Sequence, residues 1–398
     1  MKRLILFPDV FIWEAPEKCV VYNSIERKGS IIQLDDGLSD LICHLQNPDS
    51  LYSIVLHDSL FRTKQIETFL SYILDSNSGC IVDDSPDLKL SLKPILRIQD
   101  DATYYKWQLR QGITEDAVNN LHSVILNVGS DYGDDLFAKQ TLYPVKNSGE
   151  NIVFRDVLDF FNRARGSDFL SDISIVGNCG GVMREDFLQQ ISTITNLNFY
   201  LNYEYIRSNP TILNTLSDYG KVTVLVRASC SLDDMSWFLP DLVKDISQIW
   251  ILIESEKDYD VLCSFGSELL ARNIVSVIPL FNGCNINFMH KALDIDVGEL
   301  LANGPDKRQI FINQALNVFD FGKLYIMPSG LVYANLCNAP IGSIKDNISK
   351  LIISEFSKGT SWLKTRGEGK CRKCMFRFLC PSPSNYESLM NTSFCNIF

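Results

Sequence analysis

Apolar and polar positions alternate along residues 10–34, and turn-forming residues separate the alternating runs. The segments VFIWE, CVVYN and GSIIQL predict three short strands, with Pro16, Asn23 and Gly29 between or beside them. Beyond these strands the apolar residues recur every three or four positions, which is the spacing of helices. The start of the chain therefore combines a small sheet with helices.

Two helices are expected after the strands. The first is DDGLSDLICHLQ, which Asp35 or Asp36 can cap. The second is TKQIETFLSYILDSNSG, which Thr63 caps and which Gly79 is placed to end. Strands and helices together predict a winged-helix-like module over residues 1–90.

From residue 121 onward an apolar run is followed by a helical pattern six times. Apolar strands that alternate with helices predict a parallel sheet covered by helices. We therefore expect an α/β fold over residues 121–317, in the form of a partial TIM-like (β/α)6 barrel; a doubly wound sheet fits the pattern equally well. The apolar runs are LHSVILNV, SDISIVGN, NFYLNYEY, KVTVLVRA, QIWILIES and IVSVIPL.

Residues 91–120 show no clear period and are expected to form a linker. After residue 317 the pattern becomes hairpin-like in GKLYIMPSGLVYANLCNAPIGSI, followed by one helix and a cysteine-rich segment. Residues 318–398 are thus expected to form a small C-terminal domain.

Composition narrows the classes of function. The chain has 398 residues, of which 46% are apolar, and a net charge of −11. Its apolar start is interrupted by Pro8 and Asp9, and no run of 18 apolar residues follows, which predicts a soluble, cytoplasmic protein that does not bind membranes. The net negative charge disfavours nucleic acid.

A winged helix often reads DNA, but residues 1–84 contain 7 Lys and Arg against 13 Asp and Glu, a net of −6. The alternative use of such a module is recognition of an extended peptide, added as a strand to an exposed sheet edge. The strand GSIIQL and the following helix then predict a peptide groove. Its residues are Ile31, Ile32, Gln33, Phe69 and Ile73.

The segment CRKCMFRFLCPSPSNYESLMNTSFC contains Cys371, Cys374, Cys380 and Cys395. Four thiolates at this spacing can converge on a zinc ion or on a [4Fe-4S] cluster, and the neighbouring Lys and Arg residues offset their negative charge. The alternative is four unrelated buried thiols. The scattered cysteines, including Cys43, Cys80, Cys230 and Cys263, are expected to be core residues.

The pattern C-x2-C-x5-C followed by a distant cysteine resembles the C-terminal SPASM domain of radical S-adenosylmethionine (SAM) peptide-modifying enzymes. The resemblance implies that Cys371, Cys374, Cys380 and Cys395 ligate one auxiliary [4Fe-4S] cluster. A second auxiliary cluster would need a cysteine where this chain has Ser384. Cys337 lies near one expected ligand position of that second cluster, which we regard as lost.

If the tail is SPASM-like, the first barrel strand should end in a C-x3-C-x2-C loop that binds the SAM-cleaving cluster. Here that loop is GSDYGDDLFAKQTLYP, which contains no cysteine, and the motif occurs nowhere in the chain. The turn after the second strand, Gly177-Asn178-Cys179-Gly180, also lacks the carboxylate of the family's SAM-binding turn. No SAM is therefore expected to bind.

This combination resembles the pseudo-radical SAM proteins that accompany radical SAM enzymes in Bacteroidales clusters for double-glycine-leader peptides, with CMFRFLCPSPSNYE as the specific match. The resemblance implies a non-catalytic accessory protein that binds a precursor leader and a partner radical SAM enzyme. Two alternatives stay open. One is an iron–sulfur redox enzyme or diverged SAM binder, and the other is a zinc-stabilised peptide-binding scaffold.

Overall fold

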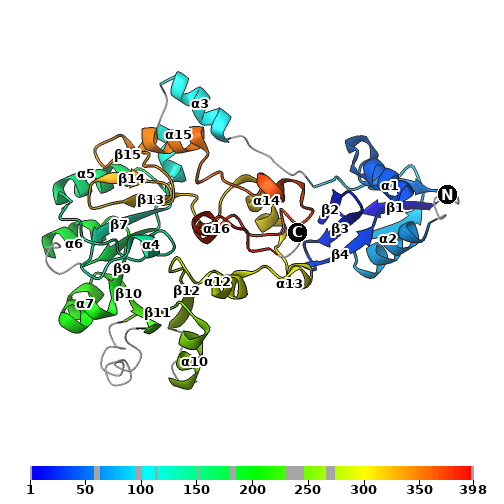
Figure 1. Ribbon diagram of the computed structural model, residues 1–398. Helices are drawn as coiled ribbons and strands as arrows, with labels where there is room; N and C mark the ends of the chain where they lie inside the picture. The colour runs from blue at the N-terminus through cyan, green and yellow to red at the C-terminus, as the bar shows by residue number, and fades with distance from the viewer. Residues whose placement is uncertain are drawn as a thin grey trace.

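The computed structural model describes residues 2–57, 63–94, 101–112, 115–150, 152–178, 185–229, 246–265 and 274–395. The chain is elongated, with the N-terminal module at one end and a large sheet at the other (Figure 1). The segment that carries the tail cysteines lies between these two parts. Cys179 and Cys230 lie outside the described residues.

The N-terminal module has two three-stranded antiparallel sheets and two helices. The three strands and two helices expected from the sequence are confirmed, and Asp35 and Thr63 cap the helices by accepting hydrogen bonds from Leu38 N and Ile66 N. Strands β1, β5 and β6 were not expected. The elements are β1 (Lys2–Leu6), β2 (Val10–Ala15), β3 (Lys18–Asn23), β4 (Lys28–Gln33), α1 (Asp36–Gln46), η1 (Pro48–Ser50), β5 (Ser53–Leu56), α2 (Lys64–Asp75) and β6 (Gly79–Asp83).

The sheet β2-β3-β4 is covered on both faces. One face, with Ile12, Val21 and Ile32, packs on the module's own helices. The other face, with Trp13 and Tyr22, packs on residues near the C-terminus. Because alternate residues of a strand point to opposite faces, one short sheet joins the two ends of the chain.

A nine-stranded sheet has the order β12-β11-β10-β9-β8-β7-β13-β14-β15. Neighbouring strands from β7 to β12 are parallel and follow one another in chain order, which is the order of a barrel wall and not of a doubly wound sheet. A mixed α/β fold with a large parallel sheet is thus confirmed. Its elements are β7 (Ser123–Gly129), α4 (Asp135–Ala138), α5 (Phe154–Ala164), β8 (Asp172–Gly177), α6 (Glu185–Ser192), β9 (Asn196–Asn202), α7 (Tyr203–Ser208), α8 (Ile212–Ser217), β10 (Gly220–Arg227), β11 (Gln248–Ile253), α10 (Glu256–Phe265), β12 (Val275–Pro279) and α12 (Ile286–Leu293).

The remaining elements connect the large sheet to the tail. The expected hairpin forms and extends the sheet, because β13 pairs with β7 in parallel and β14 and β15 follow in antiparallel order. Helix α15 lies against α3 and η3 of the segment that was expected to be a linker (Figure 1). These elements are α3 (Asp101–Arg110), η3 (Glu115–Asn120), α13 (Val297–Ala302), α14 (Lys307–Ala315), β13 (Lys323–Ile326), β14 (Leu331–Tyr333), β15 (Gly342–Ser343), α15 (Ile348–Lys358), η4 (Gly369–Lys373) and α16 (Asn385–Met390).

Two expectations about single residues are wrong. Gly79 does not end α2, which stops at Asp75; it opens β6, where a side chain would meet the carbonyl oxygen of Ile5. Cys43 and Cys263 are exposed and not in the core. Cys43 lies on α1 beside buried Ile42, which shows that one position along a helix separates the core face from solvent.

Among the described residues, no helix is long and apolar enough to span a membrane.

Glu355 on α15 is fully buried and organises the chain before the cysteine segment. Its Oε1 accepts hydrogen bonds from Ser361 N at 2.7 Å and from Trp362 N at 2.9 Å. Replacement of Glu355 by Ala should lower the free energy of unfolding by about 3 kcal/mol, because two buried N–H groups lose their acceptor. Glu355→Gln keeps one carbonyl oxygen and should cost about 1 kcal/mol or less. Urea unfolding measures both, and an equal loss in the two variants would contradict this role.

Candidate functional site

The carboxyl end of the parallel sheet is closed by the loop that follows β7. Buried Asn127 holds the start and end of this loop together. Its Oδ1 accepts from Gly129 N at 3.0 Å and from Val145 N at 3.3 Å, and its Nδ2 donates to Tyr143 O. Asn202, at the end of β9, donates to Tyr132 O at 2.8 Å. The loop is therefore fastened to two strands by amide side chains.

The same loop packs apolar side chains against the carboxyl end of the sheet's inner face. Asp134 caps the short helix α4 by accepting from Leu136 N and Phe137 N. Phe137 and Tyr143 are buried, with ring centroids 5.5 Å apart, in one cluster with three leucines from the carboxyl ends of neighbouring strands. These leucines are Leu225, Leu252 and Leu280. We call residues 130–146 the plug, because they occupy the position where barrel enzymes bind ligands.

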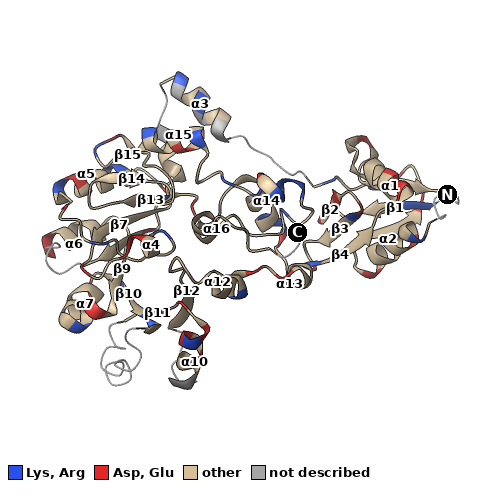
Figure 2. Cartoon of the chain, viewed as in Figure 1, with Lys and Arg blue, Asp and Glu red and all other residues tan. Residues whose placement is uncertain are grey.

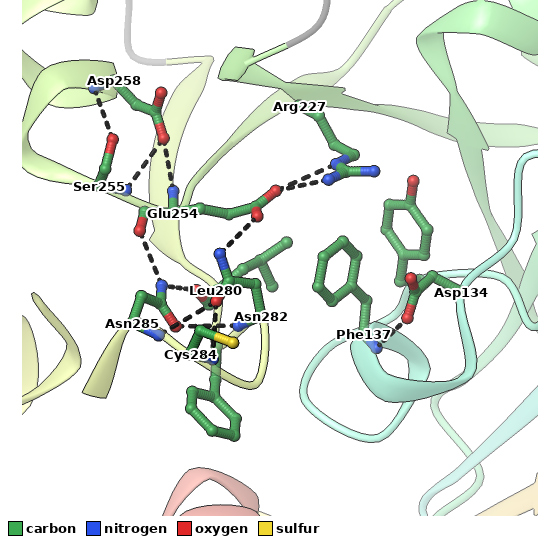
Figure 3. Close-up of polar contacts among 12 residues, drawn as sticks. Asp134, Phe137, Arg227, Glu254, Ser255, Asp258, Leu280, Asn282, Cys284 and Asn285 are labelled. Carbon is green, nitrogen blue, oxygen red and sulfur yellow. Dashed lines mark hydrogen bonds and ion pairs between the residues drawn. The ribbon is translucent and has the colours of Figure 1, made fainter.

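An ion pair next to the plug, together with an asparagine, connects the carboxyl ends of β10, β11 and β12 (Figure 3). Arg227 at the end of β10 donates to Glu254 Oε1 from Nη2 at 2.7 Å, and its guanidinium lies 4.9 Å from the ring centroid of Phe137. Asn282 donates to the second carboxylate oxygen of Glu254 at 3.1 Å. Asn285 bonds the carbonyls of Glu254 and Leu280. The protein's own groups thus satisfy both carboxylate oxygens of Glu254.

Sequence reasoning missed this ion pair. Arg227 and Glu254 are each the first charged residue at the end of an apolar run, LVR and LIE. A charged residue at the carboxyl end of a parallel strand is the signal that could have found them. Their pairing could not be read from the sequence, because 27 residues separate them.

A cavity of about 660 Å³ lies between the inner face of the sheet and the C-terminal segment. It is lined by the first residues of β7, β8 and β13, which are Ser123, Asp172 and Lys323. Helix α16 forms part of its opposite wall, where Asn385 donates to Lys139 O and Tyr386 donates to Pro279 O. The tail therefore connects the plug to the end of β12 across the open side of the sheet.

The four tail cysteines come close enough to influence one another electrostatically. Burial raises the pKa of the Cys380 thiol to about 12, Arg366 lowers it, and Cys374, Cys395 and Cys371 each raise it further. Burial also raises the pKa of Cys374, which Cys395 and Cys371 raise further. Cys395 is held beside Ile295 by a β-bridge.

Arg366 lies beside these thiols and is almost fully buried. Its Nη1 is 3.8 Å from Cys371 Sγ, and its guanidinium makes two bonds of 3.0 and 3.1 Å to the carboxylate of Glu387. Ser384 and Glu387 form a capping box at the start of α16. Ser384, which stands where a second auxiliary cluster would need a cysteine, is thus the N-cap of the tail helix.

Four thiols of this kind match the donor preference of zinc and of iron–sulfur clusters. In the parts of the chain that the structure describes, however, no three Cys, His, Asp or Glu side chains surround a common point as ligands of a metal ion. The donor chemistry therefore fits a metal centre, whereas the thiols as placed would have to close further to bind one.

The expected peptide groove divides into exposed and buried residues. Leu34 N donates to Glu17 O, which fixes which residues of β4 bond to β3. Because bonded and non-bonded residues alternate in an antiparallel pair, the backbone N–H and C=O groups of Ile32 point to β3. Those of Ile31 and Gln33 point to the free edge. These edge groups have no hydrogen-bond partner among the described residues. Ile31 is 39% exposed, whereas Ile32, Phe69 and Ile73 are buried in the core.

A second cavity of about 440 Å³ opens beside this edge and is lined by Ile31, Lys18, Met375 and Phe376 together with residues 294–297. The free edge of β4 thus faces a recess formed by the C-terminal part of the chain. The side chains available to a ligand there are Ile31 and its neighbours in the recess, and not Phe69 or Ile73.

No protein-family model matches the chain, and no curated protein matches it. Among solved structures, it is similar to Streptococcus suis SuiB bound to S-adenosylmethionine, with 10% identity, a TM-score of 0.39, and coverage of 98% of this chain and 97% of that one. SuiB bound to precursor peptide SuiA gives 10% identity and a TM-score of 0.38 over 98% of this chain and 97% of that one. At so low a TM-score and sequence identity, the function of this chain does not follow from the likeness.

Asp320 in the cavity wall should make stability depend on pH. Burial raises the pKa of this carboxyl to about 6, above an unfolded value of about 3.9, although Asn335 donates a hydrogen bond to it. The folded state then binds the proton more tightly, so its stabilisation is complete below pH 4 and is lost as the pH rises through about 6.

Asp320→Asn should remove this dependence. Relative to the variant, the free energy of unfolding of the wild type should fall by about 3 kcal/mol between pH 4 and pH 7, because the pKa of Asp320 is about 6 in the folded state and about 3.9 in the unfolded state. Urea unfolding at several pH values measures the difference. Parallel profiles for the two proteins would contradict it.

Proposed function

We propose that this chain is a non-catalytic accessory protein in the maturation of ribosomally made peptides by a partner radical SAM enzyme. The observation that carries the proposal is the plug. Residues 130–146 follow the first parallel strand, contain no cysteine, and fill the carboxyl end of the inner face with Phe137 and Tyr143. A radical SAM enzyme would bind its catalytic cluster in that loop.

The packing of the plug supports a role without SAM chemistry. Removing buried Phe137 and Tyr143 from the leucines would expose large aromatic side chains, at a cost of about 2–3 kcal/mol each. Arg227 and Glu254 neutralise each other, so neither side chain is free to pair with the amino acid part of SAM. The sheet then serves as a rigid support, and we assign residues 121–317 to docking the partner enzyme.

The free edge of β4 supports peptide capture. Unpaired N–H and C=O groups at Ile31 and Gln33 offer the ladder to which an extended peptide adds as a strand. We therefore assign residues 1–90 to recognition of the precursor leader and residues 91–120 to the connection. Residues 318–398 carry one [4Fe-4S] cluster on Cys371, Cys374, Cys380 and Cys395, or zinc in the same thiolates.

Metal analysis after anaerobic purification tests the thiol site. The proposal predicts about four irons and four acid-labile sulfides per chain, as in one [4Fe-4S] cluster, lost when Cys371 and Cys374 are both replaced by Ala. Cys43→Ala/Cys263→Ala, two exposed thiols elsewhere, is the matched control and should keep the metal. About one zinc without sulfide would select the scaffold alternative. Unchanged metal in the double variant would contradict the ligand assignment.

Proline at the β4 edge tests peptide capture. Ile31→Pro removes an N–H that points away from β3, so the sheet should survive while strand addition fails. Affinity for labelled double-glycine-type leader peptides should fall by about tenfold or more, measured by fluorescence anisotropy. Val55→Pro makes the same change on β5, an edge strand of the module's other sheet, and should bind normally. Equal affinities for the two variants would rule out the β4 edge.

A further inference from the structure

A basic groove lies at the other edge of the sheet β2-β3-β4, between β2 and residues 370–377, which we call the cysteine knuckle. Its volume is about 250 Å³. It is lined by residues 10–14, Gln46, Tyr52, Lys93 and Pro94 and, from the knuckle, by Arg372, Lys373, Cys374 and Arg377. We call this space the knuckle groove.

The groove is positively charged although the protein is acidic. Four of the eight residues 370–377 are Lys or Arg and none is acidic, in a chain of net charge −11. Arg372 and Lys373 are exposed and form no ion pair with any described residue. Figure 2 shows Lys and Arg following one another along this segment beside α14. Glu14 is the one carboxylate among the described residues that line the groove.

Among the described residues, the cation that contacts a tail thiol is Arg366 and not a basic residue of the groove. Its Nη1 lies 3.8 Å from Cys371 Sγ, and it is paired with Glu387. Lys93 comes from a distant part of the sequence, and its ammonium group contacts the backbone and side-chain oxygens of Gln46 at 3.4 and 3.3 Å. Cations from two separate segments thus face one space.

The edge of β2 beside the groove is closed to strand addition. Val10 O accepts from Tyr52 Oη at 2.6 Å, and Ile12 O accepts from Gln46 Nε2 at 3.2 Å. Both are outward carbonyls that an added strand would need. A ligand in this groove must therefore be recognised through side-chain charge, in contrast to the open backbone edge of β4.

We propose that the knuckle groove binds a glutamate- or aspartate-rich segment of a peptide, through ion pairs from Arg372, Lys373 and Lys93 to its carboxylates. The inference rests on the proposed function, because it supplies a second contact for the peptide that β4 captures. Guanidinium and ammonium groups that have no acidic partner form such pairs without first breaking another. Binding of this kind weakens as salt screens the charges.

Fluorescein-labelled hexaglutamate is the probe, with the full metal-loaded chain and anisotropy as the readout. The wild type should bind it saturably at low salt, and affinity should fall steeply as the salt concentration rises. Arg372→Ala/Lys373→Ala should weaken binding by about tenfold, and Lys93→Ala by about threefold. Absence of saturable binding to the wild type would overturn the proposal.

The controls separate this site from the metal centre and from general charge. Lys350→Ala/Lys358→Ala removes two exposed cations on α15 and should leave binding unchanged. Glu14→Gln removes the opposing carboxylate and should tighten binding by about twofold. Lys93 is neither a proposed metal ligand nor a sequence neighbour of one, so Lys93→Ala should leave the metal content unchanged. Equal affinity in all variants, or loss in the Lys350/Lys358 control, would also overturn the proposal.

Ile31→Pro separates capture of the leader at β4 from binding of an acidic segment in the knuckle groove. This variant should lose leader peptides while keeping hexaglutamate, because its change lies at the other edge of the sheet. If Ile31→Pro keeps leader binding, the proposed capture at β4 fails. If Arg372→Ala/Lys373→Ala keeps hexaglutamate binding, the groove assignment fails and β4 capture is unaffected.

Discussion

The packing of Phe137 and Tyr143 against the leucines at the ends of three parallel strands decides what the large sheet can do. Carboxyl ends of parallel strands are where barrel proteins bind their ligands, since the loops there converge on one space. In this chain the converging loop fills that space with its own side chains. Asn127 and Asn202 fix its backbone, and Arg227 stacks over Phe137, so apolar packing and hydrogen bonds stabilise the same arrangement.

The tail segment makes the rest of the molecule depend on that arrangement. Asn385 bonds the carbonyl of Lys139 in the plug, and Tyr386 bonds Pro279 at the end of β12. Arg366 connects the same helix to the thiols through Glu387. Beyond the knuckle, Phe378 packs on Trp13 of the N-terminal sheet at a centroid distance of 5.9 Å. The tail cysteines therefore lie where the large sheet, the tail segment and the N-terminal module meet.

Local sequence patterns predicted the elements that are long or clearly capped. The caps at Asp35 and Thr63 and the six apolar strands after residue 121 followed from periodicity and side-chain chemistry alone. Strands β1, β5 and β6 were missed because each is only four or five residues long, and they pair with partners far along the chain. Gly79 was misread because a glycine can end a helix or allow two strands to approach closely, and only the fold decides between these uses.

Among the candidate site residues, those that form a sequence motif were predicted, and those that meet only through the fold were not. The sequence grouped Cys371, Cys374, Cys380 and Cys395 as one ligand set, and this assignment stays a prediction. The structure shows what holds the distant Cys395 in place, a β-bridge to Ile295. Arg366 and the Arg227–Glu254 pair depend on tertiary proximity and left no motif in the sequence. The buried state of Phe69 and Ile73 was also hidden, because helical periodicity identifies an apolar face without saying whether a core or a ligand covers it.

Titration of the purified, metal-loaded protein with S-adenosylmethionine, followed by calorimetry, tests the central claim most directly. If the plug occupies the carboxyl end of the sheet, this metal-loaded protein should show no saturable binding of S-adenosylmethionine, even at millimolar concentration. Saturable binding at micromolar concentration would contradict the account, because it would require the plug to leave the space that it fills in this structure.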